Sequence, residues 1–170
     1  MEADMVVEIP AGSRNKYEMD HESGRINLDR TLFTATTFPT DYGYLVDTAG
    51  EDGDPLDAIV LLEEPTFPGC GIKVRPIGVF WMEDEDGPDS KLLCVPAEDP
   101  RWQDTTAVSD LASHLLAEIG HFFDVYKDLE PGKHTEVSGW RDRDEAELLL
   151  TEARDRYRIA AGTDTSASTR

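Results

Sequence analysis

Three aspartates stand close together in the stretch DGDPLD, at Asp52, Asp54 and Asp57. Two carboxylates about 5 Å apart near a protein surface repel each other by roughly 3 kcal/mol, so such a group needs either screening water or a cation among its oxygens. Gly53 and Pro55 bend the chain, which allows the three side chains to converge on one point. Carboxylate oxygens are hard ligands that suit magnesium, manganese or calcium. The stretch therefore predicts either a divalent-cation site or a solvated acidic turn.

A calcium-binding EF-hand loop explains this stretch poorly. If Asp52 takes position 1 of such a loop, Asp54 and Glu63 match the acidic positions 3 and 12. Leu56, however, falls at position 5 without an oxygen ligand, and Asp57 falls at position 6, where the sharp turn requires glycine. Flanking helices are not expected either, so the EF-hand interpretation is rejected.

A second acidic group follows in MEDEDGPDSK, which carries Asp84, Glu85, Asp86 and Asp89. The sequence EDGPD favours a turn, so this group is expected at the tip of a hairpin. By itself the pattern is typical of a solvated turn. Each acidic group, however, lies at the end of a strand with core-like composition, and two such groups facing each other across the mouth of a barrel would hold several metal ions.

Basic side chains are scarce, but several lie within or at the ends of the expected strands and helices. They are Lys16, Arg30, Arg75, Lys91 and Lys127, the last of them beside Tyr126. Each alone is typical of a surface charge. Together they suit a small polyanion, because lysine, arginine and tyrosine donate hydrogen bonds to phosphate oxygens. Metal ligands on one side and cationic donors on the other indicate phosphoryl transfer, and the sequence contains neither a glycine-rich Walker loop nor the kinase motifs.

The overall charge limits the range of partners. Sixteen basic residues stand against 36 acidic ones in 170 residues, which gives a net charge of -20. Nucleic acid and anionic membranes would be repelled by such a surface, whereas metal cations and metal-bound substrates would not. An apolar stretch of about 20 residues and a signal-peptide pattern are both absent from the sequence. Cys70 and Cys94 stand beside apolar residues and are expected to be buried reduced thiols, so a cytoplasmic protein is predicted.

Strands are expected in the first hundred residues and helices in the rest. Short alternating or β-branched segments predict strands over residues 5–10, 15–20, 24–30, 57–64, 72–84 and 90–99. One helical face is formed by Leu111, Leu115, Ile119, Phe122 and Tyr126. Ser109 is expected to cap this helix, a second helix is predicted over residues 144–161, and a disordered tail over 162–170. The pattern predicts an α+β protein with a barrel or sandwich and two flanking helices.

Further motifs accompany DGDPLD, which fits the signature D-x-D-P-x-D. In chain order they are EIP at Glu8–Pro10, NKYE at Asn15–Glu18, LDR at Leu28–Arg30, YGY at Tyr42–Tyr44, RPIGV at Arg75–Val79 and HFFDVYKDLEPGK at His121–Lys133. In this order the set resembles the family I soluble inorganic pyrophosphatases over nearly the whole chain, from about Glu8 to Arg158. The sequence DHESGR around His21 resembles the corresponding stretch of the actinobacterial branch of that family.

The resemblance implies a fold, a reaction and an assembly. The fold is a five-stranded OB-like β-barrel with two main flanking α-helices, in one pyrophosphatase domain over residues 1–161. The reaction is the hydrolysis of inorganic diphosphate, bound as its magnesium complex, to two orthophosphates without a covalent intermediate. Several Mg²⁺ ions per active site are implied, with Mn²⁺ as a substitute. The resemblance alone also implies a homohexamer.

The resemblance assigns roles to individual residues as well. The implied metal ligands are Glu8, Asp52, Asp57, Asp84 and Asp89. The implied donors to the two phosphate groups are Lys16, Arg30, Tyr42, Lys91, Tyr126 and Lys127. Asp54 matches the residue that accepts a proton from the attacking water, while Glu18 and His21 lie near the site without an assigned role. One departure is Phe38, which stands where many relatives have tyrosine, so that one phenolic hydroxyl is missing.

Two classes of function are therefore to be distinguished. One is a magnesium-dependent diphosphate hydrolase, in which metals about 3.5–4 Å apart share a water and lower its pKa from 15.7 toward neutrality. The other is a non-catalytic acidic calcium-binding protein. The lysine, arginine and tyrosine set favours the hydrolase, because a calcium buffer has no use for phosphate donors.

Overall fold

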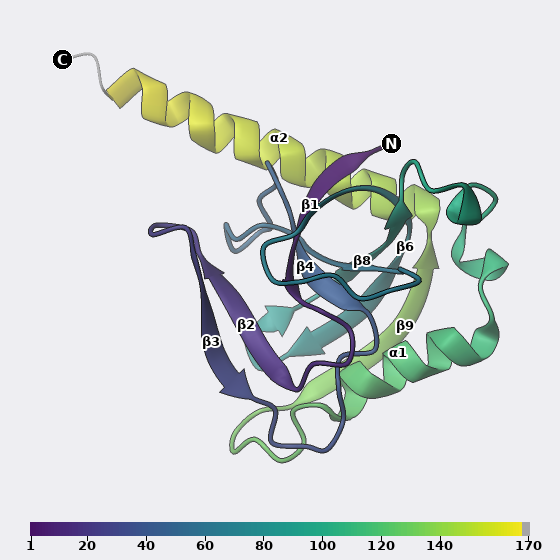
Figure 1. Ribbon diagram of the computed structural model, residues 1–170. Coiled ribbons are helices and arrows are strands. Elements are labelled where there is room, and N and C mark those ends of the chain that lie inside the picture. The colour runs from purple at the N-terminus through teal and green to yellow at the C-terminus, as the bar shows by residue number, and fades with distance from the viewer. Residues whose placement is uncertain (168–170) are drawn as a thin grey trace.

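The computed structural model describes the backbone of residues 1–167 and the side chains of residues 1–162 (Figure 1). The elements are β1 (Ala3–Ile9), β2 (Asn15–Asp20), β3 (Arg25–Thr31), β4 (Asp41–Leu45), β5 (Asp57–Val60), β6 (Gly71–Asp84), β7 (Gly87–Pro88), β8 (Lys91–Pro96), the 3₁₀ helices η1 (Pro100–Trp102) and η2 (Val108–Asp110), α1 (Ser113–Val125), β9 (Thr135–Asp142) and α2 (Arg143–Ala167). Neither α1 nor α2, in the described part of the chain, combines the length and the hydropathy needed to cross a bilayer.

Five strands close into a ring in the order β1-β4-β5-β8-β6, because β1 pairs with both β4 and β6. All neighbours are antiparallel except β5 and β8, which run parallel. Figure 1 shows α2 lying along one side of this ring and α1 across another. The ring and the two helices confirm the predicted five-stranded barrel of the α+β class.

Alternating side chains explain why β1 belongs to this ring. Ala3, Met5, Val7 and Ile9 are buried, while the intervening Asp4 and Val6 are more exposed. Gly43 on β4 allows the close approach of β1, since a Cβ there would lie 2.0 Å from the backbone oxygen of Val6. The central glycine of the YGY motif is thus required by strand packing.

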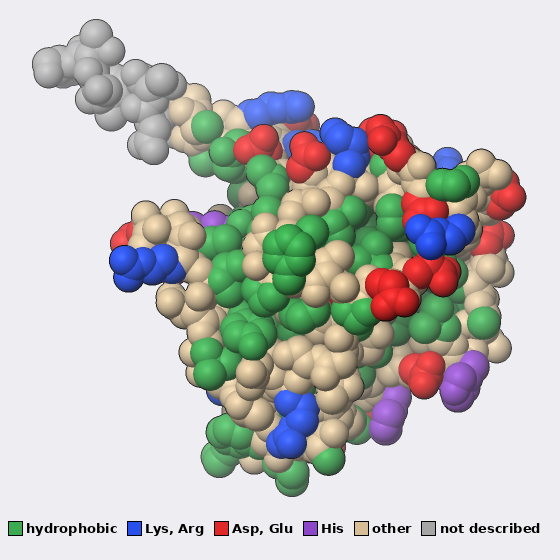
Figure 2. Space-filling model, viewed as in Figure 1, with side chains coloured by type: hydrophobic (Ala, Val, Ile, Leu, Met, Phe, Trp, Pro, Cys, Tyr) green, Lys and Arg blue, Asp and Glu red, His purple; other side chains and the backbone are tan. Residues whose placement is uncertain are grey.

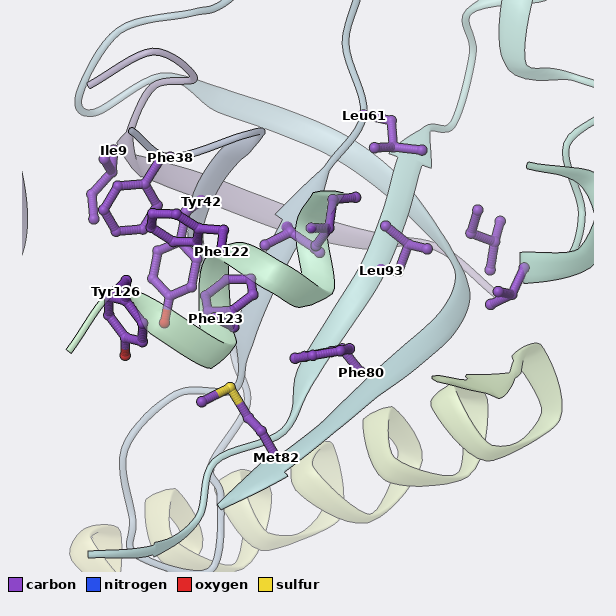
Figure 3. Packing of buried hydrophobic residues seen from close by; sticks show 14 of the residues in the cluster. Ile9, Phe38, Tyr42, Leu61, Phe80, Met82, Leu93, Phe122, Phe123 and Tyr126 are labelled. Atoms are coloured by element: carbon purple, nitrogen blue, oxygen red, sulfur yellow. The ribbon is translucent and has the colours of Figure 1, made fainter. Parts of the chain in front are cut away.

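An aromatic cluster fills the ring and carries two tyrosines of the predicted site. The rings of Phe38, Tyr42, Phe122, Phe123 and Tyr126 lie in successive contact, with centroids 4.7 Å apart for Phe38 and Phe122 and 5.2 Å apart for Phe122 and Tyr126. Figure 3 shows the hydroxyl ends of Tyr42 and Tyr126 directed to the same side of the cluster. The core therefore fixes both hydroxyls at one end of the barrel.

Several expectations about the elements are wrong. Strands β4 and β9 are not among the predicted strands. Four of the five residues of β4 are buried, but the strand is short and contains no β-branched residue, whereas in β9 polar residues separate Val137 and Trp140, which pack against the core. Ser109 does not cap α1: it lies within η2, and the N-cap of α1 is Ala112, which makes no side-chain capping bond.

Helix α2 runs beyond its predicted end and continues to Ala167. It is anchored to the barrel by Ala146, Leu150 and Ala153, which are spaced along one face and buried. Residues 168–170 of the predicted tail, and the side chains after Gly162, lie outside the described residues. The domain limit at residue 161 and the disordered tail stay predictions.

Charge is distributed unevenly over the surface. On the face shown in Figure 2, hydrophobic side chains cover a broad central area, whereas acidic side chains gather in the upper and right-hand parts of the view. On this face the acidic side chains are therefore gathered in some regions and not spread evenly.

The two cysteines differ in exposure, which corrects the expectation that both are buried. Cys94 is fully buried in β8, and burial raises the pKa of its thiol to about 12. Cys70 is only half-buried, and its thiol donates to the backbone oxygen of Gly71 at 3.8 Å.

We expect the Cys70 thiol to react readily with Ellman's reagent at pH 8 in the native protein, and the Cys94 thiol only after denaturation, because reactivity requires an accessible thiolate. Cys70→Ser should abolish the fast phase. Two fast-reacting thiols in the native protein would contradict this assignment.

Candidate active site

The site is centred on Lys91, the first residue of β8, whose side chain is 2% exposed. Because β5 and β8 are parallel neighbours, Asp57 at the start of β5 lies beside it. The ammonium donates to Asp57 Oδ2 at 2.7 Å and also to Asp89, which lies just before β8. The Tyr42 hydroxyl donates to the same Asp57 oxygen at 2.5 Å, and the Lys91 Nζ lies 5.5 Å from the centre of the Tyr42 ring. Strand pairing thus creates a buried cation between two carboxylates.

The environment of this cluster shifts the pKa values of its members. Burial raises the pKa of Asp89, and the charges of Asp57 and Asp84 add to that effect against the opposing influence of Lys91. Burial also raises the pKa of the Tyr42 hydroxyl well above its usual value, so it stays a neutral donor. Burial would lower the pKa of Lys91, but the charges of Asp57 and Asp89 outweigh it and the pKa rises. The ammonium therefore stays charged throughout the physiological range.

The second acidic group lies beside this cluster, at the end of β6. Lys127, just after α1, donates to Asp84 Oδ2 at 2.7 Å and lies 3.6 Å from Glu85 Oε2. Lys133 forms a further ion pair with Glu85. Within the described residues, one set of acidic ligand atoms lies mutually within 4.8 Å, and it comprises Asp84, Glu85 and Asp86. The two acidic stretches of the sequence thus approach one another where Asp57 and Asp89 share the Lys91 ammonium.

Glu8 reaches the site from the end of β1. Its side chain is 9% exposed and accepts a hydrogen bond from the backbone nitrogen of Met19 at 2.7 Å. Burial, together with the charge of Asp57, raises its pKa to about 7 against the opposing effect of that hydrogen bond. A cation bound close by would lower this pKa and favour the charged carboxylate.

The hairpin of β2 and β3 supplies two more cations. Lys16 forms ion pairs with Glu18 and, at 3.5 Å, with Asp29. Arg30 donates through Nη1 to Asp29 and through Nε to Glu130 Oε1 at 2.9 Å. Asp29 therefore links the two basic side chains of the hairpin.

Asp52 and Asp54 lie in an exposed turn before β5 and do not join the Lys91 cluster in this structure. The backbone nitrogen of Asp54 donates to Asp52 Oδ1 at 3.0 Å, and the backbone oxygen of Asp54 accepts from Gly50 at 2.7 Å. The three aspartates of DGDPLD therefore do not converge as expected. Asp57 joins the Lys91 cluster, whereas Asp52 and Asp54 stay in the exposed turn.

Other candidates are placed as follows. Tyr126 is buried, and its ring centroid lies 5.5 Å from the Lys127 Nζ. His21 is exposed and contacts the Tyr44 ring edge-on at 4.8 Å between ring centroids. Phe38 is a core residue in contact with Tyr42. Arg75 is not a phosphate donor of this cluster, because its guanidinium donates to the backbone oxygens of Trp102 at 2.9 Å and Thr105 at 2.8 Å and holds the η1 segment.

Sequence reasoning missed two acidic residues that contact the predicted donors, Asp29 and Glu130. Glu85 belongs to the second acidic group of the sequence, but the sequence does not predict its contact with Lys127. Asp29 and Glu130 lie within the motifs LDR and DLEPGK, but motif letters do not show which side chains meet. Arg30 and Glu130 are 100 residues apart in the chain, so their contact follows from the fold.

The side chains present fit a hard divalent cation. The convergent ligand atoms are carboxylate oxygens, and their crowding around one ammonium shows a surplus of negative charge. Alongside them lie three lysines, an arginine and two tyrosines, which suit phosphate oxygens. The arrangement can hold cations and a small phosphorylated anion next to one another.

Comparisons with known proteins agree with this chemistry. The family model for inorganic pyrophosphatase matches residues 5–158. An inorganic pyrophosphatase of Streptomyces coelicolor is 56% identical over 162 residues, covering 95% of this chain and 99% of that protein. One of Leifsonia xyli subsp. xyli is 58% identical over 147 residues, covering 86% and 90%. Both source organisms are actinobacteria, in agreement with the predicted branch.

Solved structures show the same fold. The crystal structure of inorganic pyrophosphatase from Thermus thermophilus superposes with a TM-score of 0.90 at 45% identity, covering 92% of this chain and 91% of that chain. The enzyme from Helicobacter pylori gives a TM-score of 0.90 at 41% identity, covering 92% and 94%. These matches confirm the predicted enzyme class, a metal-dependent diphosphate hydrolase, over the calcium-binding alternative. The chain belongs to the inorganic pyrophosphatase family.

Proposed function

We propose that this chain hydrolyses the magnesium complex of inorganic diphosphate to two orthophosphates by attack of water, without a covalent enzyme intermediate. The observation that carries the proposal is the buried Lys91 ammonium between Asp57 and Asp89, beside the hydroxyl of Tyr42. It places ligands for cations next to donors for phosphate. The family assignment supports the same reaction.

Five carboxylates would hold the divalent cations. These are Glu8, Asp52, Asp57, Asp84 and Asp89. Bound there, Mg²⁺ would lower the pKa of a water molecule and neutralise charge on the phosphate oxygens. Mn²⁺ would substitute, because it accepts the same oxygen ligands. Four of the five, Glu8, Asp57, Asp84 and Asp89, already interact electrostatically in this structure.

The other side chains bind substrate and move a proton. Six donors would grip the two phosphate groups: Lys16, Arg30, Tyr42, Lys91, Tyr126 and Lys127. Their charge would also stabilise the negative charge that develops on the leaving phosphate. Asp54 would accept a proton from the attacking water, and its exposed position gives it access to solvent. Glu18 and His21 lie near enough to influence the site from the hairpin side.

Location and assembly complete the proposal. Two free cysteines and the solvent-exposed acidic surface suit a cytoplasmic protein that binds neither nucleic acid nor membrane. The family resemblance supports a homohexamer, and the broad uncharged area on the face in Figure 2 is compatible with contacts between copies.

Phosphate release tests the proposed reaction directly. Diphosphate with Mg²⁺ should yield two orthophosphates per molecule consumed, and chelation of the metal should abolish the release while circular dichroism stays unchanged. Calcium supplied alone is a useful control, since a calcium buffer would bind it without releasing phosphate. Folded, metal-loaded protein that releases no phosphate would refute the proposal.

A further inference from the structure

Arg30 lies on an element that cannot hold it firmly by itself. Strands β2 and β3 form a two-stranded sheet separate from the barrel, and most residues of β3 are exposed. Two-stranded hairpins are marginally stable unless something else anchors them. A long arginine side chain there would lose considerable rotamer entropy on binding phosphate unless it were already held in place.

Glu130 supplies an anchor from the opposite side. It follows α1, in the segment that carries Tyr126 and Lys127, and Figure 1 shows this segment beside the end of β3. A local turn fixes its backbone, since the nitrogen of Glu130 donates to the oxygen of Lys127 at 2.9 Å and its oxygen accepts from Lys133 at 3.2 Å. Its side chain is 6% exposed, so little water competes for the carboxylate.

Glu130 contacts only one nitrogen of the Arg30 guanidinium, which leaves the other two available to bind phosphate. The contact uses Nε, at 2.9 Å from Glu130 Oε1. Nη1 donates to Asp29, an exposed carboxylate that solvent or an anion can displace, and Nη2 has no acceptor among the described residues. A guanidinium held by Nε presents its terminal amino groups outward, which is the edge that binds phosphate in a bidentate manner.

Building on the proposed diphosphate hydrolysis, we propose that Glu130 is a positioning residue: it holds Arg30 by Nε against the segment of Tyr126 and Lys127, so that both sides of the site present their donors to the same substrate. Burial of the Arg30 guanidinium is offset by the hydrogen bond and charge of Glu130, and the pKa of Arg30 is raised overall. Glu130 itself does not touch the substrate. Its effect on turnover passes through Arg30.

A double-mutant cycle tests this dependence. Glu130→Ala should lower kcat/KM for magnesium diphosphate about tenfold, with most of the change in KM, whereas in an Arg30→Ala background the same change should cost less than about twofold. Glu130→Gln keeps an acceptor for Nε and should recover part of the loss. Affinity for imidodiphosphate, an analogue with a non-hydrolysed bridge, should fall in parallel when it is titrated calorimetrically with Mg²⁺.

The matched control is Glu145→Gln. Glu145 lies on α2, away from the site, and accepts a hydrogen bond from Trp81 Nε1 at 3.0 Å. It should leave kcat/KM and analogue affinity unchanged. Equal kinetic losses from Glu130→Ala with and without Arg30, or a fall in melting temperature alone with normal kinetics, would overturn the inference. Absence of turnover in the unmodified protein would instead refute the proposed function, so the two failures are distinguishable.

Discussion

Lys91→Met is expected to lower the free energy of unfolding by about 3–5 kcal/mol when divalent cations are absent, because it leaves two carboxylates without their buried counter-ion. Lys91 is 2% exposed and contacts both Asp57 and Asp89, whose side chains are 31% and 24% exposed, so water can compensate the two carboxylates only in part. The methionine fills a similar volume, which keeps a cavity from contributing to the loss. Chemical denaturation with and without EDTA measures the change.

Magnesium should restore part of this stability. A cation that binds the folded state and not the unfolded chain shifts the equilibrium toward folding, and in the variant it would also offset the charge that Lys91 normally neutralises. The variant should therefore gain more from Mg²⁺ than the unmodified protein does. Turnover should stay low, because the donor itself is missing.

Lys73→Met provides the matched comparison for this variant. Lys73 pairs with Asp4 at 3.4 Å, but both side chains are more than half exposed, at 51% and 68%. Solvent-screened ion pairs of this kind contribute little to stability, so the denaturation midpoint of Lys73→Met should barely differ from that of the unmodified protein. Equal midpoints for both methionine variants in EDTA would show that the Lys91 cluster is not the electrostatic centre described above.

Much of the fold follows from apolar patterning. The alternation in β1, the continuous apolar run of β8 and the face of α1 that contains Ile119 and Phe122 reflect burial, which local sequence records directly. β9 escapes prediction because its pairing with β6 is its main support, and that pairing joins segments that are distant in the chain. The start of α1 is also hard to predict. Ser109 is a residue type that often caps helices, but here it lies within the 3₁₀ helix η2, before α1 begins.

The site is predictable in its residue types and less so in its contacts. Acidic clusters together with basic residues in strands indicate metals and phosphate from the sequence, because crowded like charges repel one another unless cations or water screen them. The pairing of Lys91 with Asp57 depends on the parallel register of β5 and β8, and that of Arg30 with Glu130 on how the hairpin meets the segment after α1. Such contacts lie between distant parts of the chain, and sequence spacing carries no record of them. Arg75 is an example of a basic residue in a strand that does not belong to the phosphate donors. Its guanidinium donates hydrogen bonds to two backbone oxygens.

Asp54→Asn is expected to lower kcat for magnesium diphosphate by roughly 10²–10⁴-fold at neutral pH with little change in KM, because an amide cannot accept the proton of the attacking water. The exchange preserves size, and the hydrogen bonds that Asp54 makes to Asp52 and Gly50 come from its backbone. The variant should therefore melt like the unmodified protein and show the same shift with Mg²⁺. Initial rates of phosphate release, measured across a range of diphosphate concentrations, separate kcat from KM.

Two observations distinguish a proton acceptor from a residue that merely adds negative charge near the metals. Glu51→Gln removes a charge from the same exposed turn and should leave kcat within about twofold, since surface charges this well screened have small effects. The deficit of Asp54→Asn should also narrow as pH rises, because hydroxide in solution replaces the missing base. If the two variants lose activity equally, or if the Asp54→Asn deficit stays constant with pH, the turn acts through its overall charge and Asp54 does not accept the proton.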